Sequence, residues 1–136
     1  MSYGYFPFDQ WLGATTTNTG GTPAILAGSP GITMDTQVVA EADGTYTVDL
    51  TGLDPEATSQ NGILLVSPVA NNSRFALSTS KPDGSFAVIH HIADSTGNGS
   101  AWVQDPITFV YIPADAAGTN GLVASGRIRG DGSQEA

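Results

Sequence analysis

The sequence predicts an all-β fold, an antiparallel β-sandwich or a small barrel with an extended aromatic N-terminal arm. Three observations support this prediction. The 136 residues include 17 Gly and 8 Pro, which interrupt the chain at short intervals. No segment keeps a helical period of apolar residues. About seven short apolar or alternating segments are separated by turn residues, as in sandwiches and barrels. This length suits one domain.

We expect residues 1–31 to form an N-terminal arm and loop, and residues 32–136 to form a single β domain. The stretch "ATTTNTGGTPAILAGSPGIT" is polar and rich in Gly and Pro, so an extended arm or loop rather than core is predicted between Asp9 and Ile32. The arm either closes the core of its own domain or lies across a neighbouring subunit, where Tyr and Trp are favoured anchors. Its candidate contact residues are aromatic: Tyr3, Tyr5, Phe6, Phe8 and Trp11.

The first regular segment, "TQVVAEADGTYTVDLTGL", predicts a strand, a turn and a second strand. Asp43-Gly44 is a strong signal for a short hairpin. After it, Tyr46, Val48 and Leu50 alternate with polar residues. This alternation predicts a strand with one buried face.

The later strands follow the same logic. "GILLVSPVA" is a continuous apolar run and predicts a strand buried on both faces. "RFALSTSKPDGSFAVIHHI" predicts a hairpin that turns at residues 82–84, "ITFVYIP" a strand from Ile107 to Ile112, and "GLVASGRI" a last strand. We interpret the recurrence of "DG" before Thr or Ser, at Asp43, Asp83 and Asp131, as hairpin turns and not as an internal repeat. The predicted core is Val48, Leu50, Ile63, Leu65, Phe75, Leu77, Phe86, Val88, Phe109, Tyr111 and Val123.

The charge balance limits the classes of partner. Thirteen Asp and Glu against four Lys and Arg give a net charge of −9. Binding to nucleic acid needs clustered cations, and binding to anionic membranes needs positive charge, so neither partner is expected. No run approaches the roughly 20 apolar residues of a membrane span, and "MSYGYFPFDQWLG" lacks the features of a signal peptide. The absence of Cys excludes disulfides and zinc–thiolate sites.

One loop has the spacing of a calcium site. In "DSTGNGSAWVQD", residues 94–105, oxygen ligands stand at Asp94, Thr96, Asn98 and Asp105, with a glycine for the turn. Flanking helices are missing from the sequence pattern, and Trp102 lies where such a loop is normally polar. The alternative is a long turn between two strands, built from Ser, Thr, Gly and Asn. We expect no cofactor, with weak calcium binding as the lesser alternative.

Catalytic motifs are not found. His90 and His91 are adjacent in a strand, so their side chains point to opposite faces and cannot share one metal, and one of them is expected to face the core or an interface. The chain has neither a GxSxG nucleophile motif nor a phosphate loop with its Lys. The integrin-type tripeptide at residues 129–131 is explained by the turn at Asp131. No enzyme is predicted.

Four segments carry a resemblance to a known kind of module: "FPFDQWLGA", "DGTYTVDLTGL", "NGILLVSPVANNSRFALSTSKPDGSFAVIHHIADSTGNG" and "VQDPITFVYIP" with "GLVASGRI". Together they resemble a β-rich module of large extracellular proteins from environmental bacteria. The resemblance covers most of the chain and implies neither a defined activity nor a catalytic residue. In such modules the stretch similar to "SGRIRGDGS" leads into a further strand, which leaves open whether the chain is complete or cut from a larger protein.

The sequence therefore predicts a non-catalytic structural protein that acts by assembly. The expected setting is a virion surface, as in a bacteriophage capsid decoration (cement) or tail protein. The expected partners are a larger protein assembly, such as a capsid, and further copies of the protein itself. We expect the homo-oligomer to be a trimer. The acidic, Gly- and Thr-rich composition and the aromatic arm favour this interpretation. The alternative is an adhesion or carbohydrate-binding module of a secreted bacterial surface protein, in which exposed Trp11 and Trp102 would stack on sugar rings.

Overall fold

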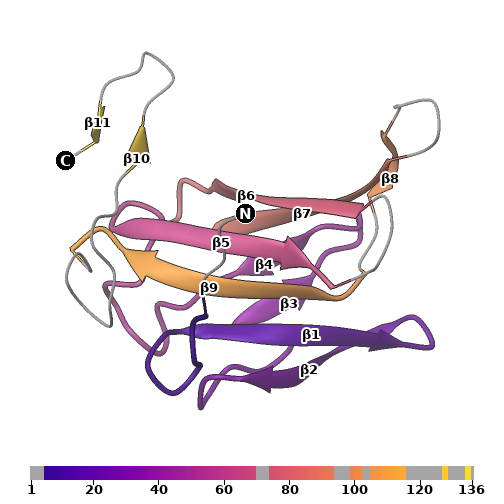
Figure 1. The fold of residues 1–136 in the computed structure, drawn as a ribbon, viewed down its shortest axis with the longest axis horizontal. Helices are drawn as coiled ribbons and strands as arrows, with labels where there is room; N and C mark the ends of the chain where they lie inside the picture. Colours follow the sequence, from indigo (N-terminus) through magenta and orange to yellow (C-terminus); the bar gives the residue numbers. More distant parts are fainter. Residues whose placement is uncertain are drawn as a thin grey trace.

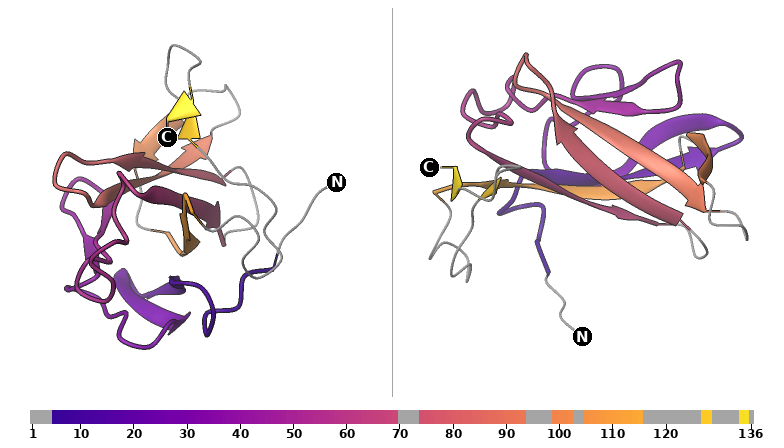
Figure 2. Two further views of the ribbon diagram at one scale, coloured as in Figure 1. Left: turned by 90° about the vertical axis from the view of Figure 1, so that its left-hand side faces the viewer. Right: turned by 90° about the horizontal axis from the view of Figure 1, so that it is seen from above.

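A computed structural model describes residues 5–69, 74–93, 99–102, 105–115, 127–128 and 134–135. These residues contain no helix and form two antiparallel sheets that pack face to face (Figure 1). Figure 2 shows the same layers from the end of the sandwich and from above. The prediction of an all-β antiparallel sandwich is confirmed, and no closed barrel is seen among the described strands.

The two sheets have four strands each along their main path. Sheet A has the order β2-β1-β9-β5, and sheet B has the order β3-β4-β7-β6, with β8 pairing beside β7. A separate two-stranded sheet pairs β10 with β11. The strands are β1 (Gly13–Thr19), β2 (Thr22–Gly28), β3 (Val38–Ala40), β4 (Tyr46–Val48), β5 (Gly62–Pro68), β6 (Arg74–Ser80), β7 (Phe86–Ala93), β8 (Gly99–Trp102), β9 (Ile107–Pro113), β10 (Arg127–Ile128) and β11 (Gln134–Glu135).

The hairpin of β1 and β2 corrects the expected arm and loop over residues 1–31. Residues 13–28 are strands of sheet A, and β1 pairs with β9 in the middle of that sheet. Gly20 and Gly21 have φ values of 66° and 86°, as a two-residue turn matching the strand twist requires. The polar strand tolerates burial because its hydroxyls are bonded: Thr16 is buried, and its Oγ1 accepts a 3.0 Å hydrogen bond from the Ile107 N–H.

The two predicted "DG" hairpins of sheet B share one turn geometry, which confirms the interpretation at both sites. Asp43 Oδ1 accepts hydrogen bonds from the Thr45 N–H and hydroxyl, at 3.0 and 2.7 Å. Asp83 Oδ1 makes the same pair of bonds with Ser85, at 3.0 and 2.6 Å. The glycine after each aspartate has a φ of 89°. The hydroxyl bond first, and the backbone bond second, lower the pKa of both carboxyls. The third predicted turn, at Asp131, lies outside the described residues.

The core lies between the sheets, and it confirms part of the predicted set. Six predicted residues are buried: Val48, Leu50, Phe86, Val88, Phe109 and Tyr111. Ile63 is half-buried on the outer side of sheet A, and Val123 lies outside the described residues. Three predicted core residues are instead exposed: Leu65, Phe75 and Leu77. They are exposed because strands alternate, so each points away from the sandwich while its neighbours point inward.

Candidate functional site

The N-terminal aromatic residues begin the candidate site, because a turn brings two of them together. The Pro7 carbonyl accepts hydrogen bonds from the N–H groups of Gln10 and Trp11, at 3.1 and 3.0 Å. This turn places the Phe6 and Trp11 rings edge to face, with centroids 5.4 Å apart and planes at 89°. Such an edge-to-face contact between aromatic rings is favourable. The two rings therefore form one apolar unit.

This aromatic pair covers the outer face of sheet A. Trp11 is buried to 7% exposure against Val110 and Ile112 of β9, and Phe6 and Ile63 pack around them. The alternate residues of β9 point into the sandwich core, so the strand is covered on both sides. The aromatic arm was expected either to pack on its own domain or to contact a neighbouring subunit. Phe6 and Trp11 pack on their own domain.

Beside Phe6 the cover ends and a hollow of about 240 Å³ opens on the outer face of sheet A. Its walls include Phe6, Leu65, Ser67, Thr108 and Val110; we call it the outer-face hollow. Leu65 lies directly opposite Val110 in the β5–β9 ladder, and Ser67 lies directly opposite Thr108. On this face of the sheet, the hollow is therefore lined by two apolar side chains at one pair of residues and by two hydroxyls at the next pair.

The remaining arm residues have different surroundings. Tyr5 is 86% exposed, although it directly precedes Phe6. Phe8 is half-buried, and its ring edge would lie 3.0 Å from a Cβ added at Gly13. Tyr3 lies outside the described residues. The structure thus brings Phe6, Phe8 and Trp11 against sheet A and leaves Tyr5 in solvent.

β5 and β6 lie side by side where the two sheets meet (Figure 1), and four exposed apolar side chains lie on these strands or directly after β5. Leu65, Val69, Phe75 and Leu77 are each between 42% and 50% exposed; we call them the β5–β6 surface. The Ser78 hydroxyl donates a 2.6 Å hydrogen bond to the Leu64 carbonyl, so the chain neighbours Leu65 and Leu77 flank the contact between the two strands. Three of them, Leu65, Phe75 and Leu77, belong to the predicted core, because an apolar run does not show which of its faces is covered.

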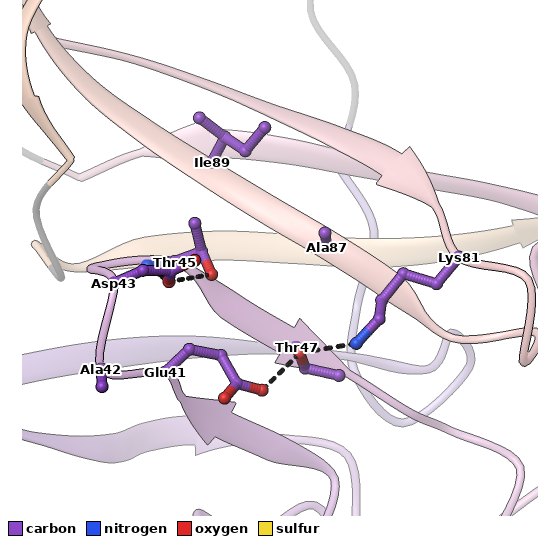
Figure 3. Close-up of a pocket in the computed structure, with 8 residues that line it drawn as sticks. All are labelled: Glu41, Ala42, Asp43, Thr45, Thr47, Lys81, Ala87 and Ile89. Carbon is purple, nitrogen blue, oxygen red and sulfur yellow. Dashed lines mark hydrogen bonds between the residues drawn. The ribbon is translucent and has the colours of Figure 1, made fainter.

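A second hollow lies on the outer face of sheet B (Figure 3). It has a volume of about 770 Å³, and we call it the sheet-B hollow. Lys81 Nζ donates a 3.3 Å hydrogen bond to the Thr47 hydroxyl, which donates a 2.7 Å bond to Glu41 Oε1. Ala87 and Ile89 of β7 form its apolar part. No aromatic ring is among the described residues that line this hollow.

Trp102, the other predicted contact residue, ends β8. In the register of sheet B it lies opposite His91, and His91 lies opposite Phe75. The three residues therefore occupy one row across three strands. His90, the neighbour of His91, is fully buried, which confirms that one histidine of the pair faces the core.

The predicted calcium ligands are described only in part. Asp94, Thr96 and Asn98 lie outside the described residues. Asp105 is half-buried before β9, and its backbone carbonyl accepts a 3.3 Å hydrogen bond from the Tyr46 hydroxyl. The absence of a cofactor stays the prediction, with weak calcium binding in this loop as the lesser alternative, and thermal melts with calcium and with chelator distinguish the two.

Within the described ranges, no three His, Cys, Asp or Glu side chains cluster closely enough to hold a metal ion. In the same part of the chain, no helix has the length and apolar character to cross a membrane. Comparison of the chain with protein-family models, with curated proteins and with solved structures gave no match. The functional argument therefore rests on the surfaces described above.

Proposed function

We propose that this protein is a non-catalytic structural domain that acts by assembly, as a virion-surface component of the capsid decoration or tail type. The observation that carries the proposal is the β5–β6 surface. It exposes three large apolar side chains on two neighbouring strands and a fourth, Val69, directly after β5, in a chain whose net charge is −9. Contiguous exposed apolar side chains mark interaction sites in soluble proteins.

The chemistry of this surface fits a protein partner better than a charged one. Leu65, Val69, Phe75 and Leu77 carry no charge, and aromatic and apolar side chains form the centres of protein interfaces. The rest of the chain is acidic enough to keep free copies soluble. An acidic body with an apolar surface at β5 and β6 therefore favours docking on a larger assembly through that surface.

A particle-binding experiment tests this proposal. The genes on either side of this gene identify the candidate particle, and we expect them to encode capsid or tail proteins. Purified particles that lack the protein are mixed with it and sedimented, and the protein is expected to co-sediment at a fixed ratio to the shell subunit. The double variant Phe75→Ser/Leu77→Ser is expected to stay in the supernatant.

The matched control is Leu26→Ser on β2, because Leu26 is also exposed but lies on the opposite edge of sheet A. This variant is expected to bind particles like the unmodified protein. Equal binding by the double variant, with its fold retained by circular dichroism, would overturn the assignment of the surface. A genome context with no particle genes would overturn the virion setting.

A second candidate function is favoured by the sheet-B hollow. It combines hydroxyl, carboxylate and ammonium groups with the apolar Ala87 and Ile89, and sugars present both hydroxyls and apolar faces. A carbohydrate-binding module would use such a surface, although its usual aromatic platform is not among the described lining residues. Glycan-array binding that is lost in Thr47→Val would support this function over assembly.

A further inference from the structure

We propose that two copies of this chain pair about a two-fold axis, with Tyr5 of each copy inserted into the outer-face hollow of the other. The inference deepens the proposed function and rests on it, because it names one contact through which the protein assembles. Four observations, taken from the aromatic arm, the hollow, their positions and the charge, carry it.

The first observation concerns the direction of Tyr5. Phe6 lines the hollow and packs on Trp11, whereas Tyr5 is 86% exposed. Pro7 restricts Phe6 to an extended conformation, and successive side chains of an extended chain point in opposite directions. Tyr5 therefore faces away from its own sheet while Phe6 remains in place. Its exposed ring is therefore available to another molecule.

The second observation is the match between the hollow and a tyrosine side chain. At about 240 Å³ the hollow is smaller than the roughly 300 Å³ or more of ligand pockets, and it suits one aromatic ring. Leu65 and Val110 would contact the ring, and the hydroxyls of Ser67 and Thr108 lie in the next row, where a phenol hydroxyl needs partners. A tyrosine side chain has a matching arrangement, because its apolar ring ends in a polar hydroxyl.

The third observation is that donor and acceptor are neighbours on one surface. Phe6 is both a wall of the hollow and the residue after Tyr5. When a two-fold axis passes beside this surface, each Tyr5 meets the hollow of the other copy, and both contacts form together. The pairing is therefore isologous, unlike the ring that the expected trimer would need.

The fourth observation is charge. Two copies at −9 each repel one another, so self-association requires a contact surface without carboxylates. The residues that line the outer-face hollow are uncharged, as are Tyr5 and its neighbours Phe6 and Pro7. The hollow also shares Leu65 with the β5–β6 surface, so pairing extends the proposed assembly surface across sheet A.

Disulfide trapping tests the geometry, because the chain contains no cysteine of its own. The variants Tyr5→Cys and Ser67→Cys are prepared separately and mixed under mild oxidation. In the mixed pair, the Tyr5 of the Ser67→Cys copy still enters the hollow of the other copy and holds the pair in register. We expect the covalent heterodimer to form at least about tenfold faster than in a mixture of Tyr5→Cys with Leu26→Cys.

Sedimentation velocity supplies the second measurement. The unmodified protein is expected to be a dimer, and Tyr5→Ser is expected to weaken it at least about tenfold with an unchanged melting temperature of the monomer. A monomeric or trimeric unmodified protein, a dimer that survives Tyr5→Ser, or equal trapping with Leu26→Cys would each overturn the proposal. Particle binding is measured separately through Phe75 and Leu77, so failure of the pairing and failure of the assembly function are distinguishable.

Discussion

The Ser78 hydroxyl donates a 2.6 Å hydrogen bond to the Leu64 carbonyl, and it does so between strands that belong to different sheets. β5 and β6 lie at the same side of the sandwich, each at the edge of its own sheet. The bond therefore fixes the position of one sheet relative to the other at the side where the apolar side chains are exposed.

Removal of this bond is expected to loosen that side of the sandwich. Ser78→Ala leaves the Leu64 carbonyl without the hydroxyl and is expected to lower the free energy of unfolding by about 1 kcal/mol. Urea denaturation measures this change. The control is Thr79→Ser on β6, whose side chain is exposed and which lies outside the outer-face hollow. Equal effects of the two substitutions would show that the bond between the sheets is not stabilising.

Trp11 is expected to stabilise its own domain. Because it is almost fully buried against β9, Trp11→Ala should lower the free energy of unfolding by about 3 kcal/mol. The exposed Leu26 provides the control, since Leu26→Ala should change it by less than about 0.5 kcal/mol. Thermal melts at several protein concentrations measure both variants. If Trp11→Ala leaves the stability of the monomer unchanged and abolishes oligomers, the residue instead acts across a subunit contact.

Gly62 is expected to be irreplaceable at the start of β5. A Cβ at this position would lie 2.5 Å from the Ile112 carbonyl oxygen and 2.6 Å from the Tyr111 hydroxyl. That hydroxyl donates to the carbonyls of Glu56 and Thr58, both at 3.2 Å, and so attaches the preceding loop to the sheet. Gly62→Ala should lower the free energy of unfolding by about 2 to 3 kcal/mol.

Gly52 supplies the matched comparison. A Cβ there has as its nearest neighbour the Gln37 Nε2 at 3.7 Å, an ordinary contact distance. Gly52→Ala is therefore expected to be close to neutral in the same denaturant titration. A large loss at Gly52, or none at Gly62, would contradict the packing described around Tyr111.

Alkaline pH is expected to unfold the protein through two tyrosines. Burial, as the main cause, raises the pKa of Tyr46 and of Tyr111 from the ordinary value of 10 to about 12. Above pH 10 the unfolded chain loses these protons while the fold retains them, so stability falls with rising pH. The stabilising effect is complete below pH 10 and is lost as the pH rises through about 12.

Urea midpoints at pH 8, 10 and 11.5 measure this dependence. Tyr111→Phe cannot ionise at that position, so its midpoint should decline less between pH 10 and 11.5 than that of the unmodified protein. A midpoint that is independent of pH over this range would show that neither hydroxyl is held in its neutral form.

Local turn chemistry made part of the fold predictable. Asp43-Gly44 and Asp83-Gly84 specify their hairpins within a few residues, because the carboxylate binds the following Thr or Ser and glycine accepts the positive φ. Gly20-Gly21 is a similar signal, and it was missed because the flanking "TTTNT" has no apolar alternation. The threonine-rich strand β1 can be identified as a strand by its hydrogen bonds to β9, and these bonds are seen only in the folded structure.

The candidate surfaces were less predictable for a different reason. Leu64 and Leu65 are adjacent leucines in the same apolar run, yet Leu64 is buried and Leu65 is exposed. The difference depends on whether another layer covers the face, and a local pattern carries no information about such a layer. The dense aromatic residues before residue 12 did predict a packing contact. Their packing on sheet A was not predictable, because it depends on β9, which lies about one hundred residues later in the chain.

The pairing of β1 with β9 has a consequence for how the chain folds as it is synthesised. The hydroxyls of Thr15 and Thr108 meet at 2.9 Å although 93 positions separate them. The hairpins of sheet B, like the hairpin of β1 and β2, close through neighbouring residues and form soon after they leave the ribosome, whereas the second edge of β1 waits until β9 has been translated. The first strand to be made thus has one edge without its partner until late in synthesis, and during overproduction that edge of the threonine-rich hairpin stays open to capture by chaperones or by other nascent chains.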